Sequence, residues 1–260
     1  LKKKHVFEIH DDISIEGRLV KFLVKKFKIL NNDSILKIIT TTRSLKTRYI
    51  KYGVKKEKIV VLHNASSLKS KMKKYYLNPK KLNIGYFGSI YNSRGIEMII
   101  RISEIDSKND YFVYGGSKEQ ILDIKKNLKN KNIHFYPHIP YSMVYKKLLN
   151  IDVCILPYTS KITVSGNVGD ISKYTSPLKL FDYMKLGKLI LCSNLKVLNE
   201  VLHHKKNCIL INNYKDEKEW LKQINEISKN IKRYYKIRKS AFEYAKKYDV
   251  IWRTSKLLSF

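Results

Sequence analysis

Short apolar runs alternate with longer segments of helical periodicity along the chain of 260 residues, and no other feature restricts the fold as much. Strands are expected at 6–9, 35–40, 59–62, 82–87, 111–114, 133–136, 153–157, 189–192 and 208–211. Helices are expected at 15–27, 44–52, 95–103, 118–128, 141–149, 177–186, 217–227 and 234–248. Repeated strand–helix alternation predicts the α/β class, with parallel sheets covered by helices on both faces.

A polar, Lys-rich segment at 66–81, with Asn78-Pro79 near its end, is the strongest linker candidate. The series that follows it, up to residue 240, is long enough for one complete doubly wound, Rossmann-like domain at 79–240. Residues 1–78 contain only three expected strands, so we expect them to form a partial N-terminal Rossmann-like domain. The chain begins with Leu1 rather than Met, which is consistent with a fragment of a longer protein.

The chain carries 53 Lys and Arg against 22 acidic residues, a formal charge of +31. Such an excess favours anionic partners, among them phosphate-bearing substrates, an anionic membrane surface or nucleic acid. The alternative is that most of these side chains are solvated surface, because charge runs usually mark solvated faces. No nucleic-acid motif supports a specific nucleic-acid partner. Hydrophobic residues make up 43%, which excludes global disorder.

Three cysteines, Cys154, Cys192 and Cys208, show no CxxC spacing. Cys154 and Cys192 lie inside apolar, strand-like runs, so we expect buried thiols in a reducing compartment rather than a zinc or disulfide framework. No apolar run approaches the length of a transmembrane helix, and no signal peptide is visible. We therefore expect a cytoplasmic protein.

Open parallel sheets bind ligands at the carboxyl ends of their strands. Gly88 directly follows the expected strand at 82–87, where a glycine lets backbone approach a ligand closely, and Ser89 comes next. Arg94 stands at the start of the following helix, where a guanidinium can hold a phosphate bidentately beside free N–H groups. The alternative is that Gly88 serves only the turn.

The loop after the strand at 133–136 reads Pro137-His138-Ile139-Pro140. Two prolines make it stiff, so the backbone around His138 and Ile139 is a candidate for contacting a planar base. A simple turn before a helix explains the same residues at least as well.

A long segment without apolar periodicity follows Pro157 and includes 165–170, and loops of this length inside a compact domain are usually functional or mobile. It ends in a helix start with Ser176 as N-cap and Pro177 at the first helical position. A diphosphate would be stabilised there by free N–H groups, the helix dipole and Lys179. Asp182, on the same face, can accept two hydrogen bonds from a ribose diol. The alternative is a surface Lys179–Asp182 ion pair.

In the first part of the chain, His10 follows an expected strand and has Asp11 and Asp12 beside it. Acidic neighbours can orient a histidine, which makes His10 a candidate for chemistry. Capping of the helix that follows explains the two acids equally well. Glu200 is a further polar candidate with weak local support.

At these residues the sequence resembles the retaining GT-B glycosyltransferases of family 4, the glycosyl transferases group 1. The most specific match is the segment Ser176–Met184 followed by Gly187-Lys188, which looks like the family's SPLKLFEYMA-G-K segment. Supporting matches lie at 84–95, 152–158, 199–202, 8–11 and 58–65, and at 244–253, which resembles a terminal helix that crosses back to the first domain. The resemblance implies a terminal helix at 241–260.

The resemblance implies transfer of a sugar from a nucleotide-sugar donor, with retention at the anomeric carbon and without a metal or other cofactor. By position, Asp182 is implied to bind the ribose, Lys179 and Arg94 the diphosphate, and His10 to lie near the transferred sugar as the catalytic candidate. The implied donor-binding set is Gly88, Ser89, Arg94, His138, Ile139, Ser176, Pro177, Lys179 and Asp182.

Three departures from the family pattern matter. Tyr174 stands where the first acid of the family's paired-glutamate motif would fall, and Ser89 stands where a basic residue is common. Roughly the first hundred residues of a typical member are missing, and they carry much of the acceptor pocket. We therefore expect either a transferase for a glycan or lipid-linked acceptor, peripheral on the inner face of the cell membrane, or a chain that binds donor and needs a partner chain for activity.

Overall fold

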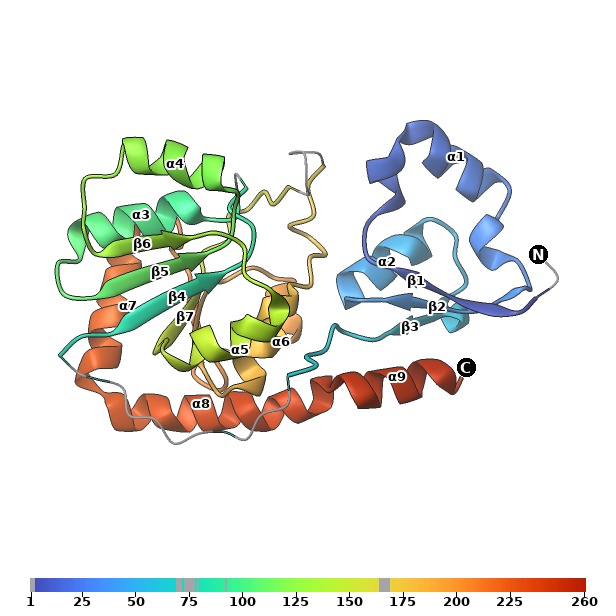
Figure 1. The fold of residues 1–260 in the computed structure, drawn as a ribbon. Helices are drawn as coiled ribbons and strands as arrows, with labels where there is room; N and C mark the ends of the chain where they lie inside the picture. The colour runs from blue at the N-terminus through green and yellow to red at the C-terminus, as the bar shows by residue number, and fades with distance from the viewer. Residues whose placement is uncertain (1–2, 69–71, 73–77, 79, 92, 164–168) are drawn as a thin grey trace.

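The computed structural model describes residues 3–68, 72, 78, 80–91, 93–163 and 169–260. It contains a three-stranded sheet near the N-terminus and a six-stranded sheet in the rest of the chain (Figure 1). All strand pairs within both sheets are parallel. The predicted α/β class, with one complete and one partial Rossmann-like domain, is confirmed.

The N-terminal unit contains the sheet β1-β2-β3, formed by His5–Ile9, Ile35–Thr40 and Ile59–Val61. Between these strands lie α1 (Arg18–Lys26) and α2 (Arg43–Lys51). The helix expected at 15–27 is divided, which corrects the prediction: a 3₁₀ turn at Ile13–Glu16 ends at Gly17, whose φ of 113° cannot continue a helix.

The C-terminal unit alternates strands and helices as the sequence pattern predicts. Its strands are β4 (Asn83–Phe87), β5 (Asp110–Tyr114), β6 (Ile133–Tyr136), β7 (Val153–Leu156), β8 (Leu189–Ser193) and β9 (Ile209–Ile211). Its helices are α3 (Ile96–Ile105), α4 (Lys118–Lys126), α5 (Tyr141–Leu149), α6 (Leu178–Lys185), α7 (Glu217–Lys229) and α8 (Ile231–Ala245), followed by α9 (Val250–Leu258). The single helix expected at 234–248 is therefore α8 and a 3₁₀ turn at Lys246–Tyr248.

The strand order in the larger sheet is β6-β5-β4-β7-β8-β9. Counted from β4 as the first strand, this is the order 3-2-1-4-5-6 of the dinucleotide-binding fold. From β4 the next strands are added toward one edge of the sheet, and from β7 they are added toward the other edge. The order of strand addition therefore reverses between β4 and β7, and a crevice opens at the carboxyl ends of these two strands. Sheet topology thus marks one edge for ligands.

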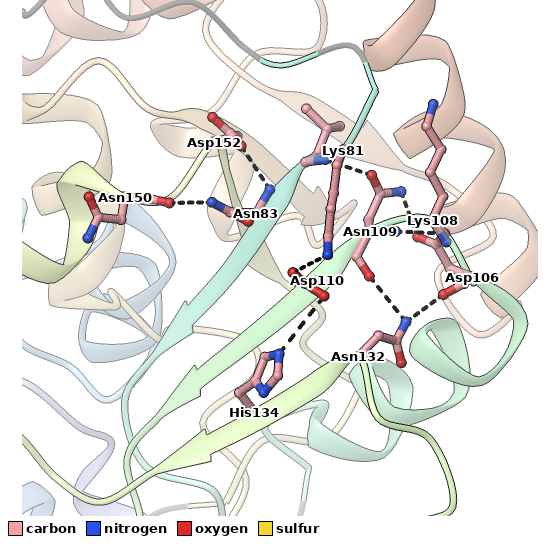
Figure 2. Close-up of polar contacts among 11 residues, drawn as sticks. Lys81, Asn83, Asp106, Lys108, Asn109, Asp110, Asn132, His134, Asn150 and Asp152 are labelled. Atoms are coloured by element: carbon pink, nitrogen blue, oxygen red, sulfur yellow. Dashed lines mark hydrogen bonds and ion pairs between the residues drawn. The ribbon is translucent and has the colours of Figure 1, made fainter.

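The opposite edge of this sheet, at the amino ends of the strands, is closed by polar contacts (Figure 2). The carboxylate of Asp152 accepts the backbone N–H of Asn83 at 2.8 Å, which joins β7 to β4. Lys81 forms an ion pair with Asp110 at 2.7 Å at the start of β5. These contacts hold the strand starts in register and leave the carboxyl edge for binding.

The core of the C-terminal unit lies on both faces of its sheet. β7 and β8 are buried along their whole length, and Trp220 on α7 is fully buried against the sheet. Cys154, Cys192 and Cys208 are free, buried thiols, as expected. Nowhere in the described part of the chain is a helix both long and apolar enough to cross a bilayer.

Glu200 and Arg253 make two of the contacts between the units. The Glu200 carboxylate of the C-terminal unit accepts the backbone N–H groups of Arg43 and Ser44 at 2.6 and 2.9 Å, which caps the start of α2. On α9, Arg253 pairs with Glu8 of β1 and donates to the carbonyl oxygen of His63 at 3.0 Å. The end of the chain thus contacts the first unit (Figure 1).

Candidate functional site

A cavity of about 360 Å³ lies at the carboxyl ends of β4 and β5 and the starts of α5 and α6. Eight of the nine residues predicted to bind a donor line it: Gly88, Ser89, Arg94, His138, Ile139, Pro177, Lys179 and Asp182. They come from four separate stretches of sequence, and the topology brings them to the edge where the strand order reverses. That they bind a donor stays a prediction.

The Lys179 side chain turns from α6 onto the end of β4. Its Nζ lies 3.9 Å from the centre of the Tyr86 ring and 5.8 Å from that of Tyr158. Burial lowers the pKa of Lys179 well below its ordinary value, and the positive charge of Arg94 lowers it further. No carboxylate in the described part of the chain pairs with this ammonium, so a bound anion would supply the missing charge.

Arg94 lies at the start of α3, on the other side of the same cavity. Its Nη2 donates to the carbonyl oxygen of Thr163 at 3.1 Å, and its guanidinium carbon lies 5.9 Å from the centre of the Tyr158 ring. Neither Arg94 nor Lys179 forms an ion pair with a carboxylate in the described residues, so these two cations of one cavity are a candidate anion site.

Two glycines make this arrangement possible. Gly88 has a φ of 136°, and a Cβ there would lie 2.2 Å from the Lys179 Nζ. Gly95 has a φ of 83°, and a Cβ there would lie 1.8 Å from the carbonyl oxygen of Pro157. The first glycine leaves room for the lysine, and the second lets α3 begin against the end of β7.

Asp182 is buried on α6, three residues after Lys179, and lines the same cavity. Its Oδ1 accepts the hydroxyls of Ser66 at 2.7 Å and Tyr141 at 2.8 Å. Burial raises the pKa of Asp182, while these two hydrogen bonds act in the opposite direction. No ion pair joins Lys179 to Asp182 in the described residues, so the alternative of a surface ion pair is wrong.

The start of α6 differs from the prediction by one residue. Pro177, with a ψ of 122°, is the N-cap and gives no side-chain hydrogen bond, so the helical conformation begins at Leu178. Ser176 therefore lies one position before the cap and is not the N-cap residue. Its carbonyl oxygen accepts the Asn64 side chain at 2.7 Å, and it does not line the cavity. The free N–H groups of the first turn remain available to an anion.

The loop between β6 and α5 is held to the neighbouring strand end. The Nε2 of His138 accepts the N–H of Gly116 at 3.0 Å, so the neutral ring carries its proton on Nδ1. Beside it, Phe87, Tyr114 and Tyr136 stack at 4.7 Å between successive ring centres. The side of the cavity formed by Phe87, Tyr114 and Ile139 is apolar and suits a planar group.

His10 does not reach this cavity. It lies at the carboxyl end of β1 with a side chain that is 59% exposed, and its Nε2 is 3.2 Å from the Glu8 carboxylate. Glu8 forms the ion pair with the imidazole, while burial raises the pKa of Asp11 and the charge of His10 acts to lower it. The alternative for Asp12 is confirmed, because its carboxylate caps the 3₁₀ turn by accepting the Ser14 N–H at 2.8 Å.

The long segment at 158–176 packs against the start of α3 in its described parts. Ser93 and Thr163 are joined by hydrogen bonds of 3.0 and 3.2 Å, and the Ile171 N–H donates to the Ile162 carbonyl oxygen at 2.7 Å. Residues 165–168 of the predicted functional stretch lie outside the described residues.

Sequence reasoning missed the partners of the predicted site residues. Tyr86 and Tyr158 enclose the Lys179 ammonium, and Ser66 and Tyr141 hold Asp182. Ser66 stands 116 positions before Asp182 and had been assigned to the linker, yet it is buried. The one available signal was the number of tyrosines, 19, which does not indicate which of them face the cavity.

The comparisons with known proteins agree with this geometry. The family model described as "Glycosyl transferases group 1" matches residues 67–247, which is most of the chain. No curated protein sequence matches the chain.

Among solved structures, the chain is similar to Alr3699/HepE from Anabaena in complex with UDP-glucose, with a TM-score of 0.72 and 15% identity. It is also similar to sucrose-phosphate synthase from Thermosynechococcus elongatus (TM-score 0.74, 14% identity) and to a TarM mutant from S. aureus solved with fondaparinux, alpha-GlcNAc-glycerol and UDP (0.70, 15%). Each match covers 98% of this chain but only 71%, 66% and 50% of the other chains, respectively.

At these identities the likeness shows the fold, which is the GT-B arrangement expected from the sequence. The family model covers the six-stranded unit, including β4 to β9 and the whole cavity. The chain belongs to the glycosyl transferases group 1 family.

Proposed function

We propose that this chain binds a nucleotide-sugar donor in the cavity between β4 and α6, and that the sugar is transferred with retention to a glycan or lipid-linked acceptor, as in family 4. The main support for this proposal is that Arg94, Lys179 and the start of α6 line one cavity, and that the Asp182 carboxylate lines it too. The UDP and UDP-glucose in complexes of Alr3699/HepE support a donor of this class.

In this proposal the diphosphate lies against Arg94, the Lys179 ammonium and the free N–H groups of α6. These groups stabilise the negative charge that grows on the leaving diphosphate, and the proposal requires no metal cofactor. Asp182 accepts the ribose hydroxyls, and Ile139 with Tyr114 contacts the base. His10, on the other unit, acts at the transferred sugar.

The setting that we propose is surface polysaccharide or glycoconjugate synthesis at the cytoplasmic face of the cell membrane. A charge of +31 supports peripheral contact with anionic lipid. The same charge gives weak binding to any polyanion, so it does not support a specific nucleic-acid partner.

A second candidate function is a chain that binds donor but is inactive without a further N-terminal part of roughly a hundred residues, supplied by a partner chain or a longer protein. The favouring observation is the outer edge of β1, which pairs with no strand in the described residues, beside an exposed α1. Sugar transfer at full rate by this chain alone would contradict this candidate.

The decisive experiment measures UDP binding by calorimetry and by hydrogen exchange of α6. UDP at 100 times its Kd should add about 2.7 kcal/mol of stability and protect Leu178–Lys185. Lys179→Gln should weaken UDP binding roughly 10- to 100-fold, because it removes a charge-assisted contact. The control Lys125→Gln removes the same charge from exposed α4 and should bind like the wild type. Protection absent from α6 would reject the site.

A further inference from the structure

A second cavity, of about 730 Å³, lies between the two units and is named here the interdomain groove. One wall is the α2 face that carries Arg43, Thr47 and Lys51, which recur every four residues and so share one side of the helix. The opposite wall comes from two loops of the C-terminal unit and carries Ser160, Lys173 and Lys196. α2 lies on the side of its sheet that faces the other unit (Figure 1).

The charges in the groove do not cancel. Arg48, which also lines it, pairs with the buried Asp12. The Glu200 carboxylate also lines the groove. It accepts hydrogen bonds from the backbone N–H groups of Arg43 and Ser44 and, at 3.0 Å, from the Ser44 hydroxyl. The side chains of Arg43, Lys51, Lys173 and Lys196 remain exposed, and none of them forms an ion pair within the described ranges.

This distribution differs from a solvated basic surface in one respect. Four cations from two units that form no ion pair within the described ranges line one concavity, and Asp170 lies near enough to Lys173 for the lysine to help lower its pKa. The positive charge that is left opposes the docking of the units. The same groove is lined by the hydroxyls of Thr47 and Ser160, so its lining has the composition of an anion-binding surface.

The groove also adjoins the donor cavity. The segment at 158–177 contributes Tyr158 and Pro177 to the donor cavity and Ser160 and Lys173 to the interdomain groove. Tyr158 and Ser160 are two residues apart, and Lys173 lies four residues before Pro177, so neighbouring parts of the chain line the two cavities.

We propose that the interdomain groove binds phosphate groups carried by the acceptor, and that Arg43, Lys51, Lys173 and Lys196 are its contacts. This inference rests on the proposed function, because it takes the neighbouring cavity as the donor site. The phosphates belong to a soluble phosphodiester glycan or polyol, or to the headgroup of a lipid-linked acceptor, and the chemistry of recognition is the same for both.

The test compares two triple variants with equal net charge. Lys51→Gln/Lys173→Gln/Lys196→Gln removes three groove cations, and Lys125→Gln/Lys232→Gln/Lys239→Gln removes three exposed cations from α4 and α8. Each protein is saturated with UDP, so that the donor cavity is occupied. It is then titrated with a synthetic glycerol-phosphate hexamer and, separately, with phosphatidylglycerol vesicles.

The groove variant should bind the hexamer, the vesicles or both roughly tenfold more weakly than the wild type, and the control variant less than twofold more weakly. Loss with the hexamer supports a soluble phosphodiester as source, and loss with vesicles alone supports a lipid headgroup. Equal weakening in both variants, or none in either, overturns the proposal. Failure of UDP to bind would instead reject the proposed function, since both triple variants leave the donor cavity untouched.

Discussion

The two parallel sheets of this protein differ in how completely they are covered and in what their strand order allows. In the six-stranded unit, helices cover both faces, and the strand order reverses between β4 and β7. In the three-stranded unit, the order β1-β2-β3 runs in one direction only, and α1 buries none of its residues. Because a crevice forms where the order reverses, the order of the three strands that the structure describes in the first unit predicts no such crevice at their carboxyl ends.

This difference in strand order explains why the predicted site residues do not all lie at one site. Eight of the nine predicted donor residues of the larger unit meet in one cavity, whereas His10, at the end of β1, remains exposed. The smaller unit contributes through its contacts with the larger one. The Ser66 hydroxyl donates to Asp182, and the start of α2 donates backbone N–H groups to Glu200. Four predictions test this contrast, in order of decreasing effect.

The largest difference in unfolding free energy is expected between substitutions of two aromatic side chains, one in each unit. Trp220 on α7 is fully buried, and Phe22 on α1 is 56% exposed. Trp220→Ala should destabilise the C-terminal unit by about 3–5 kcal/mol, and Phe22→Ala should change stability by less than about 0.5 kcal/mol. Urea unfolding followed by circular dichroism measures both. A cost near 2 kcal/mol for Phe22→Ala would mean that α1 is covered in solution.

The second prediction compares two glycines that have positive φ and are the N-cap residues of α3 and α1. A Cβ on Gly95 would meet the Pro157 carbonyl oxygen at 1.8 Å, while a Cβ on Gly17 meets nothing within 4 Å. Gly95→Ala should cost about 3 kcal/mol through clash and strain, and Gly17→Ala about 1 kcal/mol through strain alone. Thermal unfolding of each variant gives the comparison. Equal costs would show that the packing at Gly95 relaxes freely.

Glu200 makes one of the contacts between the units, at the start of α2. Glu200→Ala leaves the N–H groups of Arg43 and Ser44 without their acceptor, so α2 should lose about 1–2 kcal/mol of protection. Hydrogen exchange resolved by peptide should show the loss in α2 and little change in β7 and β8. Glu104→Ala, at an exposed position of α3, is the matched control. Faster exchange throughout the larger sheet would contradict a purely local capping role.

The smallest effect is a pH dependence of donor binding. The free protein holds the pKa of Lys179 below its ordinary value, and a bound diphosphate raises it by favouring the ammonium. Binding therefore takes up a proton between the two pKa values, and affinity should fall as pH rises through that window, by at most about tenfold per unit. UDP titrations above about pH 7.5, where the terminal phosphate is fully ionised, measure this.

Lys179→Gln removes this titrating group, so its UDP affinity should not follow the same pH profile. An identical slope in wild type and variant would assign the pH dependence to another group.

The sequence predicted the architecture well because its signals are local. Apolar runs such as those of β7 and β8 are buried over their whole length and define strands without reference to the rest of the chain. The glycine at position 88, Arg94 and the residues around Lys179 follow strands or begin helices, which places them at the carboxyl edge of any parallel sheet. Their positions in the cavity follow from topology.

Contacts between distant segments could not be predicted in this way. Ser66 and Asp182 are 116 positions apart, and Glu200 lies 157 positions from the Arg43 N–H that it accepts. Neither pair has a periodic or spacing signal. Ser66 stands at the start of the predicted linker, most of which lies outside the described residues, and no sequence signal indicated that it is buried as the hydrogen-bond donor of Asp182.

The sequence by itself thus determined the α/β class, the strand–helix order and the residues at the strand ends, because these depend on hydrophobic periodicity and turn chemistry. Only the tertiary structure decided that Lys179 folds over Gly88 onto Tyr86, that Glu200 caps a helix of the other unit, and that four cations share the interdomain groove. The first feature joins α6 to the end of β4 within one unit, and the other two arise where the two units dock. All three depend on residues that are remote in sequence.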